Sequence, residues 1–328
     1  MSPETRPAGP VVALCGGIGG AKLALGLYRR LGPDRLTVVV NTGDDFEHLG
    51  LHISPDLDTV LYTLSGRSDP DSGWGRAGET WNFMAALKEL GGETWFQLGD
   101  RDLAVHVERT RRLRAGEPLS RITASLADRF GLKARILPMS EDALRTIVQT
   151  PDGPLPFQHY FVRERCEPTV TGIEFDGAED ARAQPEAVRA LSDPDLQAVV
   201  ICPSNPYLSV DPILAVPGLR SALAACPAPV VAVSPLVGGR AIKGPTAKIM
   251  GELGIAATAQ NVCAHYQGLL DGFVLDVEDA GAAASIGLPT LVAQTVMRTL
   301  EDKRRLAQAV LEFARDLAAR KNQRWASS

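Results

Sequence analysis

The chain has 328 residues and a mass of 35.0 kDa, enough for a large buried core in one or two domains. Its 34 basic and 39 acidic residues leave a net charge of −5, which argues against a general nucleic-acid binder. The sequence shows neither a signal peptide nor an apolar run long enough to span a membrane, and its five cysteines form no C-x-x-C pair. We therefore expect a cytoplasmic protein with reduced thiols.

The first informative feature follows an apolar run at residues 11–14, which predicts a buried strand. A helix is predicted at residues 21–31, and the turn between the two holds Gly16, Gly17, Gly19 and Gly20. Such a turn points backbone N–H groups and the positive end of a helix at a phosphate, and Lys22 adds a charge. The spacing matches neither the dinucleotide fingerprint nor the P-loop. We predict a phosphate-binding loop; a tight turn without a ligand is the alternative.

A second strand is predicted at residues 36–40, and the polar loop 41–58 follows it. The loop carries four carboxylates: Asp44, Asp45, Asp56 and Asp58. Carboxylate oxygens suit Mg²⁺, which often binds one or two of them together with substrate phosphates. The alternative is helix capping, with Asp58 as the N-cap of a helix at residues 59–65. His48 and His52 lie in the same loop and are expected to pack or to lie near substrate rather than to bind metal.

A helical insertion is predicted at about residues 75–133, because three helical segments occur there without good strands between them. The loop before it places Trp74 beside Arg76, a combination suited to stacking a flat heterocycle, although a core tryptophan is the alternative. Apolar and polar residues alternate at 145–149, 155–163 and 169–175. They predict a small antiparallel β piece at about 145–176.

Strands and helices alternate again in the second half, with strands predicted at 198–202, 230–233 and 272–275 and an amphipathic helix at 300–321. The predicted fold is a doubly wound α/β domain with a mainly parallel, Rossmann-like sheet over residues 11–328, preceded by a disordered tail at residues 1–10. In such folds ligands bind at the carboxyl ends of the strands.

Two further loops lie at predicted strand ends. Ser204 and Asn205 stand between two prolines, and Ser234 begins a loop in which Gly238 and Gly239 precede several basic residues. These side chains and amides suit phosphate binding. A rigid turn and a solvated basic loop are the respective alternatives.

The ordered blocks of the sequence resemble one family. They are GGIGGAKL, NTGDD, SPDLDTVLYTLSG, GWGR with ETW, WFQLGDRDLAVH, LPMS, FQHYFV, PSNP and SPLVGGRAIKGPTAKIMGELG. Each block alone is weak, but the ordered set is similar to the 2-phospho-L-lactate transferases (CofD/FbiA-like) of coenzyme F420 biosynthesis. The resemblance implies transfer of a phospho-three-carbon acid from a guanosine diphosphate-linked donor to the deazaflavin FO, with release of GMP.

The resemblance also implies roles for particular residues. Asp45 and Asp58 would be catalytic, and Asp58, Gln97 and Trp74 would contact FO. Mg²⁺ would be held by Asp45, with Asp44 and Asp56. The donor nucleotide and its phosphates would be bound by Gly16, Gly17, Gly19, Gly20, Lys22, Ser204, Asn205, Ser234, Gly238 and Gly239. The family also suggests a homodimer.

Two departures and two rivals are relevant. Thr246 stands where the family often has Ala, and Gln97 where archaeal relatives often have a basic residue. One rival is a nucleotide-sugar-binding regulatory protein of the YvcK-like gluconeogenesis factor family, which shares the glycine loop. The other is an NAD-dependent dehydrogenase. It is disfavoured because Lys22 stands where the dinucleotide fingerprint has its third glycine. The sequence leaves open whether phospholactate, phosphoenolpyruvate or phosphoglycerate is carried.

Overall fold

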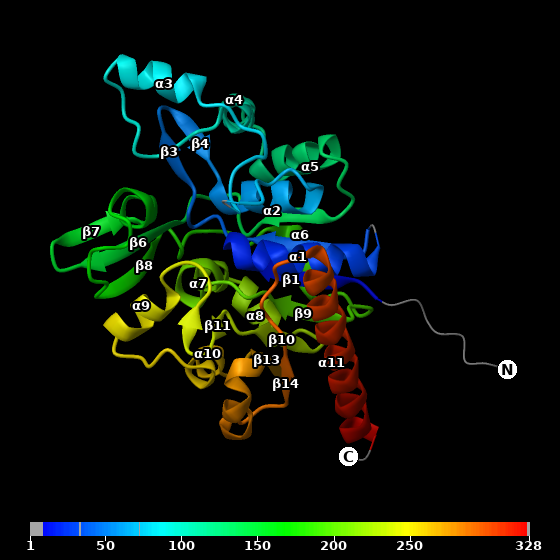
Figure 1. Ribbon diagram of the computed structural model, residues 1–328. Coiled ribbons are helices and arrows are strands. Elements are labelled where there is room, and N and C mark those ends of the chain that lie inside the picture. The colour runs from blue at the N-terminus through cyan, green and yellow to red at the C-terminus, as the bar shows by residue number, and fades with distance from the viewer. Residues whose placement is uncertain (1–8, 33, 72, 327–328) are drawn as a thin grey trace.

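The computed structural model describes residues 9–32, 34–71 and 73–326 (Figure 1). Most of the predicted disordered tail, residues 1–8, lies outside this range. Seven strands form one parallel sheet in the order β14-β13-β10-β9-β1-β2-β5, which confirms the predicted fold class. The strands are β1 (Val11–Cys15), β2 (Leu36–Val40), β5 (Arg135–Pro138), β9 (Ala198–Ile201), β10 (Val230–Val233), β13 (Gly272–Asp276) and β14 (Thr290–Ala293).

The order of the strands fixes where ligands are expected. From β1 the chain builds outward through β2 and β5, and then returns to add β9, β10, β13 and β14 on the other side of β1. The winding direction therefore reverses between β1 and β9. In open α/β sheets the loops at such a reversal diverge and form the ligand crevice at the carboxyl ends of the strands.

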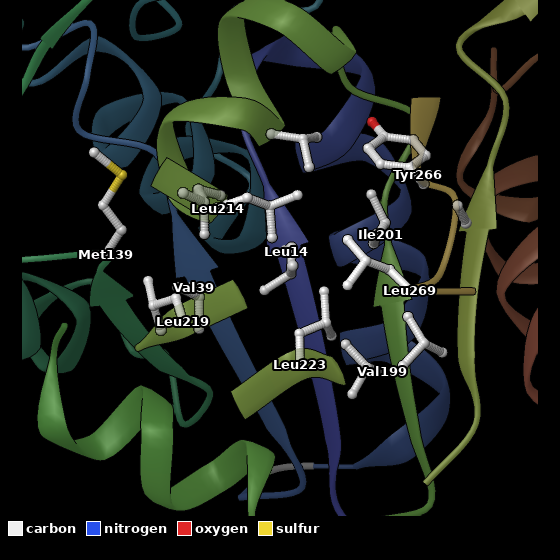
Figure 2. Packing of buried hydrophobic residues seen from close by; sticks show 14 of the residues in the cluster. Leu14, Val39, Met139, Val199, Ile201, Leu214, Leu219, Leu223, Tyr266 and Leu269 are labelled. Carbon is white, nitrogen blue, oxygen red and sulfur yellow. The ribbon is translucent and has the colours of Figure 1, made fainter. Parts of the chain in front are cut away.

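The sheet is buried on both faces, as its apolar strands predict. Figure 2 shows Leu14, Val39, Val199 and Ile201 on one face, packed against side chains that include Leu214 and Leu223. These two come from α7 (Asp211–Ala215) and α8 (Leu219–Ala224). The opposite face is covered by α1 (Gly17–Leu31) and the long α11 (Leu300–Ala326), which lie against each other (Figure 1).

The insertion lies above α2 in Figure 1 and consists of α3 (Asn82–Glu89), α4 (Asp100–Arg114) and α5 (Leu119–Arg129). Two corrections concern the preceding loop. The sequence analysis missed an antiparallel hairpin, β3 (Phe46–His48) and β4 (Leu51–Ile53), whose turn uses positive φ at Leu49 and Gly50. Helix α2 (Pro55–Ser65) begins at Pro55, because proline fits the first helical position, so Asp58 is not its N-cap.

The small antiparallel sheet is present in the order β7-β6-β8, with β6 at Arg145–Thr150, β7 at Gly153–Pro156 and β8 at Gly172–Asp176. The strand predicted at 155–163 is wrong beyond Pro156. Residues His159–Arg163 form a wide helical turn, η1, because the strand ends at a proline that cannot donate to a ladder. Strand β14 was also missed.

The remaining elements complete the layers around the sheet. They are α6 (Pro185–Leu191), η2 (Pro206–Val210), β11 (Leu236–Val237), β12 (Arg240–Ala241), α9 (Thr246–Glu252), α10 (Ala259–His265) and η3 (Val277–Ser285). Within the described part of the chain, every helix is too short or too polar to cross a lipid bilayer.

Candidate functional site

The glycine loop and the proline-flanked loop meet at the reversal between β1 and β9. The Gly16 amide donates to Ser204 Oγ at 3.2 Å, and Ser204 Oγ donates to the Gly16 carbonyl at 2.8 Å. A Cβ on Gly19 would collide with the carbonyl oxygen of Pro203, and one on Gly20 would collide with Ser204 Oγ. These glycines are therefore required for close contact between the two loops, a reason that the sequence analysis did not give.

Gly17 has a different reason for being glycine. Its φ of +64° lies in the left-handed region, and the space beside it is open. Its amide donates to Asp56 Oδ1 at 2.7 Å. The amides of Gly16 and Gly17, expected to face a phosphate, thus both have partners within the protein.

Asp56 joins this loop to the loop after β2. Besides the Gly17 amide it accepts a hydrogen bond from Asn41 Nδ2 at 2.9 Å, and the Asn41 carbonyl oxygen accepts from the Gly43 amide at 2.8 Å. Burial raises the pKa of Asp56 to about 6, and the nearby charge of Asp45 contributes in the same direction. The loops after β1 and β2 therefore converge on one buried carboxyl group.

Asp44 and Asp45 lie in the same acidic cluster as Asp56. Asp45 Oδ2 accepts from Ser54 Oγ at 2.7 Å and contacts His52 Nε2 at 3.1 Å. Burial and the charge of Asp56 raise the pKa of Asp44 well above its ordinary value. Asp44 Oδ1 and Asp45 Oδ1 are buried and have no hydrogen-bond partner. Unpartnered carboxylate oxygens are ligands of the kind that a hard divalent cation such as Mg²⁺ prefers.

Asp58 points into a separate buried network. Both of its oxygens accept hydrogen bonds from the guanidinium of Arg109 on α4, with 3.0 Å between Oδ2 and one nitrogen. Arg109 is 1% exposed. Burial disfavours its charged form, but the Asp58 carboxylate outweighs this effect, so the pKa of Arg109 is raised. His106 lies 3.6 Å from Asp58 and 3.5 Å from Asp102, and Asp102 also accepts from the Tyr62 hydroxyl. This network links α2 to α4.

Asp58, Asp102 and His106 form a buried group that could hold a metal ion. Each offers one ligand atom, and these atoms lie within 4.8 Å of one another. Among the residues that the structure describes, it is the one group of three His, Cys, Asp or Glu side chains whose ligand atoms lie this close together. The oxygens of the predicted trio of Asp44, Asp45 and Asp56 are more widely spread.

Two of the three residues predicted to contact FO, Trp74 and Gln97, lie at the surface, whereas Asp58 is buried. Trp74 is 48% exposed, whereas a core tryptophan would be buried. Gln97 is also exposed, and its side-chain amide donates to the Thr94 carbonyl at 2.7 Å. The sequence analysis missed an aromatic cluster beside Gln97. Its rings, with neighbouring centroids 4.8 to 6.1 Å apart, are Phe46, His48, Trp95, Phe96 and His159.

The remaining predicted phosphate ligands are engaged locally. Asn205 Oδ1 accepts from the Tyr207 amide at 3.0 Å, while Asn205 Nδ2 is buried without a partner and remains available as a donor. Ser234 Oγ forms a turn with the backbone of Leu236. The Gly238 amide donates to Asp279 at 3.0 Å, and both Gly238 and Gly239 have positive φ.

Lys22 is half-buried near two other lysines. Burial and the charges of Lys243 and Lys303 lower its pKa. The Lys243 side chain also lies against Gly73, because a Cβ there would come within 3.1 Å of Nζ. The loop that carries Trp74 is therefore close to this basic group, which is suited to an anion.

Sequence reasoning missed Arg109 and expected Asp102 to cap a helix and His106 to pack or cap, and one signal could have found their shared network. The three residues are separated by steps of four and three on α4, so they share one helix face. A charged stripe of this kind, in a helix that must bury one face, indicates a buried partner.

Comparisons with known proteins place the chain beside one family. The family model "2-phospho-L-lactate transferase CofD" matches residues 11–310. A protein of Kitasatospora aureofaciens named phosphoenolpyruvate transferase is 42% identical, covering 94% of this chain and 97% of its own. Proteins of the same name from Streptomyces coelicolor and Mycobacterium avium are each 40% identical, covering 94% and 82% of this chain and 98% and 88% of their own.

A solved structure has a similar fold. A member of the UPF0052 family from Bacillus halodurans superposes with a TM-score of 0.62 at 15% identity, covering 93% of this chain and 99% of its own. At this identity the likeness concerns the fold alone.

Proposed function

The chain belongs to the 2-phospho-L-lactate transferase CofD family, and from this premise we propose that it transfers a phosphoenolpyruvyl group from a guanosine diphosphate-linked donor to FO, releasing GMP, in coenzyme F420 biosynthesis. One observation carries the choice of acid. Relatives that are 40 to 42% identical over at least 82% of the chain are named phosphoenolpyruvate transferases. The family match sets aside the dehydrogenase and regulatory-protein readings of the sequence.

The reaction forms one bond and breaks another at a single phosphorus atom. The terminal ribityl oxygen of FO bonds to the phosphorus nearer the acid, the diphosphate bridge breaks, and GMP leaves with the bridging oxygen. The hydroxyl proton is released. Such chemistry needs mainly positioning and neutralisation of charge. This need fits a site made of strand-end loops rather than one built around a nucleophilic side chain.

The donor is proposed to lie across the ends of β1 and β9. Lys22 and the unpartnered Asn205 Nδ2 are donors that suit its phosphates. Ser234, Gly238 and Gly239 are proposed to lie near the donor, as predicted from the sequence; both glycines have positive φ.

The divalent cation is proposed to be Mg²⁺, held by Asp44, Asp45 and Asp56. When bound it would neutralise the diphosphate charge. The support is the pair of orphaned buried oxygens on Asp44 and Asp45. Asp45 is itself oriented by Ser54 and His52, so its free oxygen has a fixed direction.

FO is proposed to bind on the insertion side of the site. We propose that the Trp74 ring, which is 48% exposed, stacks on the deazaflavin, and that the Gln97 side-chain amide makes a polar contact with it. A contact between Asp58 and FO stays a prediction, since both Asp58 oxygens accept from Arg109.

The test is an assay of the purified protein with FO and, separately, the enolpyruvyl, lactyl and phosphoglyceryl donors. We expect FO-linked product and GMP in equal amounts, with the highest kcat/KM for the enolpyruvyl donor. Turnover that favours lactyl or phosphoglyceryl donor would refute the choice of acid. Binding of nucleotide sugars without transfer from any donor would refute the activity.

A further inference from the structure

Helix α4 of the insertion is hydrogen-bonded to the segment 52–58, which lies beside the acidic cluster. Arg109 donates two hydrogen bonds to Asp58, and Oγ1 of the next residue, Thr110, accepts from the His52 amide at 2.8 Å. Thr110 Oγ1 in turn donates to the His106 carbonyl at 2.7 Å, which ties it to its own helix. Helix α4 thus contacts both ends of the segment 52–58.

The segment 52–58 supplies most of the environment of the proposed metal ligands. His52 and Ser54 contact the same oxygen of Asp45, and Asp56 is itself one of the three acids. The Asp58 amide donates to the Ser54 carbonyl at 3.0 Å. A displacement of this segment would therefore move the partners of Asp45 and the carboxyl group of Asp56 together.

The alternative use of the network is a metal site at Asp58, Asp102 and His106. Arg109 opposes it, because one guanidinium nitrogen lies 3.0 Å from Asp58 and 3.4 Å from His106 Nδ1. A divalent cation there would meet a buried positive charge at two of its three ligands. In this network Arg109 already supplies the positive charge that the carboxylates need.

We propose that Arg109 is a positioning residue: through Asp58, and with Thr110, it fixes the segment 52–58 so that Asp45 and Asp56 keep the arrangement that binds a divalent cation. This inference rests on the proposed function for the role of that cation in transfer. It gives Asp58 a supporting role in the site besides its predicted contact with FO.

The experiment measures binding of Mn²⁺, as a stand-in for Mg²⁺, to the full-length protein without substrates, by electron paramagnetic resonance. Arg109→Met is expected to weaken Mn²⁺ affinity roughly tenfold or more, in the range seen when supporting partners of metal ligands are removed. Arg109→Lys should be intermediate, since an ammonium cannot form the forked contact. Arg112→Met is the matched control, because Arg112 lies on the same helix and pairs with Glu117 instead.

Folding is separated from positioning by a double variant. Arg109→Met alone leaves a buried carboxylate unpaired and should lower the melting temperature, whereas Arg109→Met with Asp58→Leu removes both charges and should largely restore it. We expect the double variant to retain weak Mn²⁺ affinity despite its recovered stability. Wild-type Mn²⁺ affinity in the double variant would overturn the proposal.

Three other outcomes would also overturn it. Additional bound Mn²⁺ in Arg109→Met would show a metal site at Asp58, Asp102 and His106. Weakened FO affinity with normal Mn²⁺ affinity in Asp58→Asn would place Asp58 on the substrate. Wild-type protein that binds no Mn²⁺ would remove the cation site itself. Failure of transfer with every donor would refute the proposed function and leave the Mn²⁺ comparison intact.

Discussion

At the scale of single residues, Asp56 shows how a predicted ligand also serves the structure. Its two oxygens accept hydrogen bonds from Gly17 and Asn41, which belong to the loops after β1 and β2. The sequence predicted an acid at a strand end, because the carboxyl ends of parallel strands share one edge. It could not predict the partners, since they are brought together only when the strands align.

Asp45→Asn tests the acidic cluster. Asparagine keeps the size of the side chain and can still accept from Ser54, so the melting temperature should change little. Loss of the charge should reduce kcat by about 100-fold or more, by analogy with other lost electrostatic contacts. Steady-state kinetics and calorimetry check this result, with the exposed Asp152→Asn as the control. Turnover equal to wild type would remove Asp45 from the site.

Lys22→Ala tests the basic group near α1. A charge-assisted hydrogen bond contributes about 1.5–3 kcal/mol, so the KM of the guanosine diphosphate-linked donor should rise about tenfold or more, with little change in the KM of FO. Kinetics with each substrate varied in turn measure both values. The exposed Lys88→Ala is the control, and an unchanged donor KM would make Lys22 a bystander.

At the scale of elements, buried strands and long helices were predicted because their residues repeat a simple pattern. Strand β1 is apolar throughout and β2 is apolar except for Thr37, and the amphipathic pattern of α11 was visible in the sequence. The hairpin β3–β4 was missed because Leu49 adopts positive φ without the usual Asn-Gly signal. The role of Arg109 was missed because a buried ion pair 51 residues apart in sequence leaves no local pattern.

The start of α3 gives a pH-dependent prediction. Asp100 accepts hydrogen bonds from the Phe83 amide, the Asn82 amide and the Thr80 hydroxyl. Led by the hydroxyl of Thr80, these bonds lower the pKa of Asp100 from 3.8 to about 2. Because the folded pKa is the lower one, the stabilisation is complete above 3.8 and is lost as the pH falls through about 2.

Asp100→Asn should therefore lower the melting temperature near neutral pH, and the difference from wild type should narrow only in strong acid. Melting curves across this pH range check the prediction. Asp128→Asn, at an exposed helix position, serves as the control. A difference that stays constant down to the acid limit would contradict the assigned role.

Gly26 gives a prediction about packing between α1 and α11. A Cβ at this position would collide with the carbonyl oxygen of Lys303. Gly26→Ala should therefore destabilise the protein by about 1–3 kcal/mol, the usual cost of overpacking, although alanine favours helix. Gly251→Ala is the matched control, since Gly251 lies in α9 with open space beside it and should be neutral or stabilising by up to about 1 kcal/mol. Equal effects in denaturant melts would contradict this explanation.

At the scale of the whole molecule, the doubly wound topology explains why separate sequence blocks form one site. The loops after β1, β2 and β9 carry glycines, acids and Ser204, and the strand order places these loops together. That convergence could be predicted from the sequence. The division of the chain into one domain after a short tail, and the homodimer, stay predictions.

Truncation after Thr299 tests the contribution of α11. This helix buries Leu306, Val310 and Leu317 against the sheet face that α1 also covers. Removing residues 300–328 should abolish the cooperative melting transition, because that face would be left open to water. Far-UV circular dichroism during heating measures this outcome. A cooperative transition in the shortened chain would contradict it.

The central place of β1 also has a consequence for biosynthesis. Strand β1 lies between β2 and β9, so its second neighbour comes from residues 198–201, and α11, which packs against α1, follows the other described elements in the chain. A nascent chain therefore carries an open edge on β1 until residues 198–201 have left the ribosome. Unpaired strand edges of this kind promote association between chains. We expect chaperone dependence during synthesis to exceed that of refolding from the complete polypeptide.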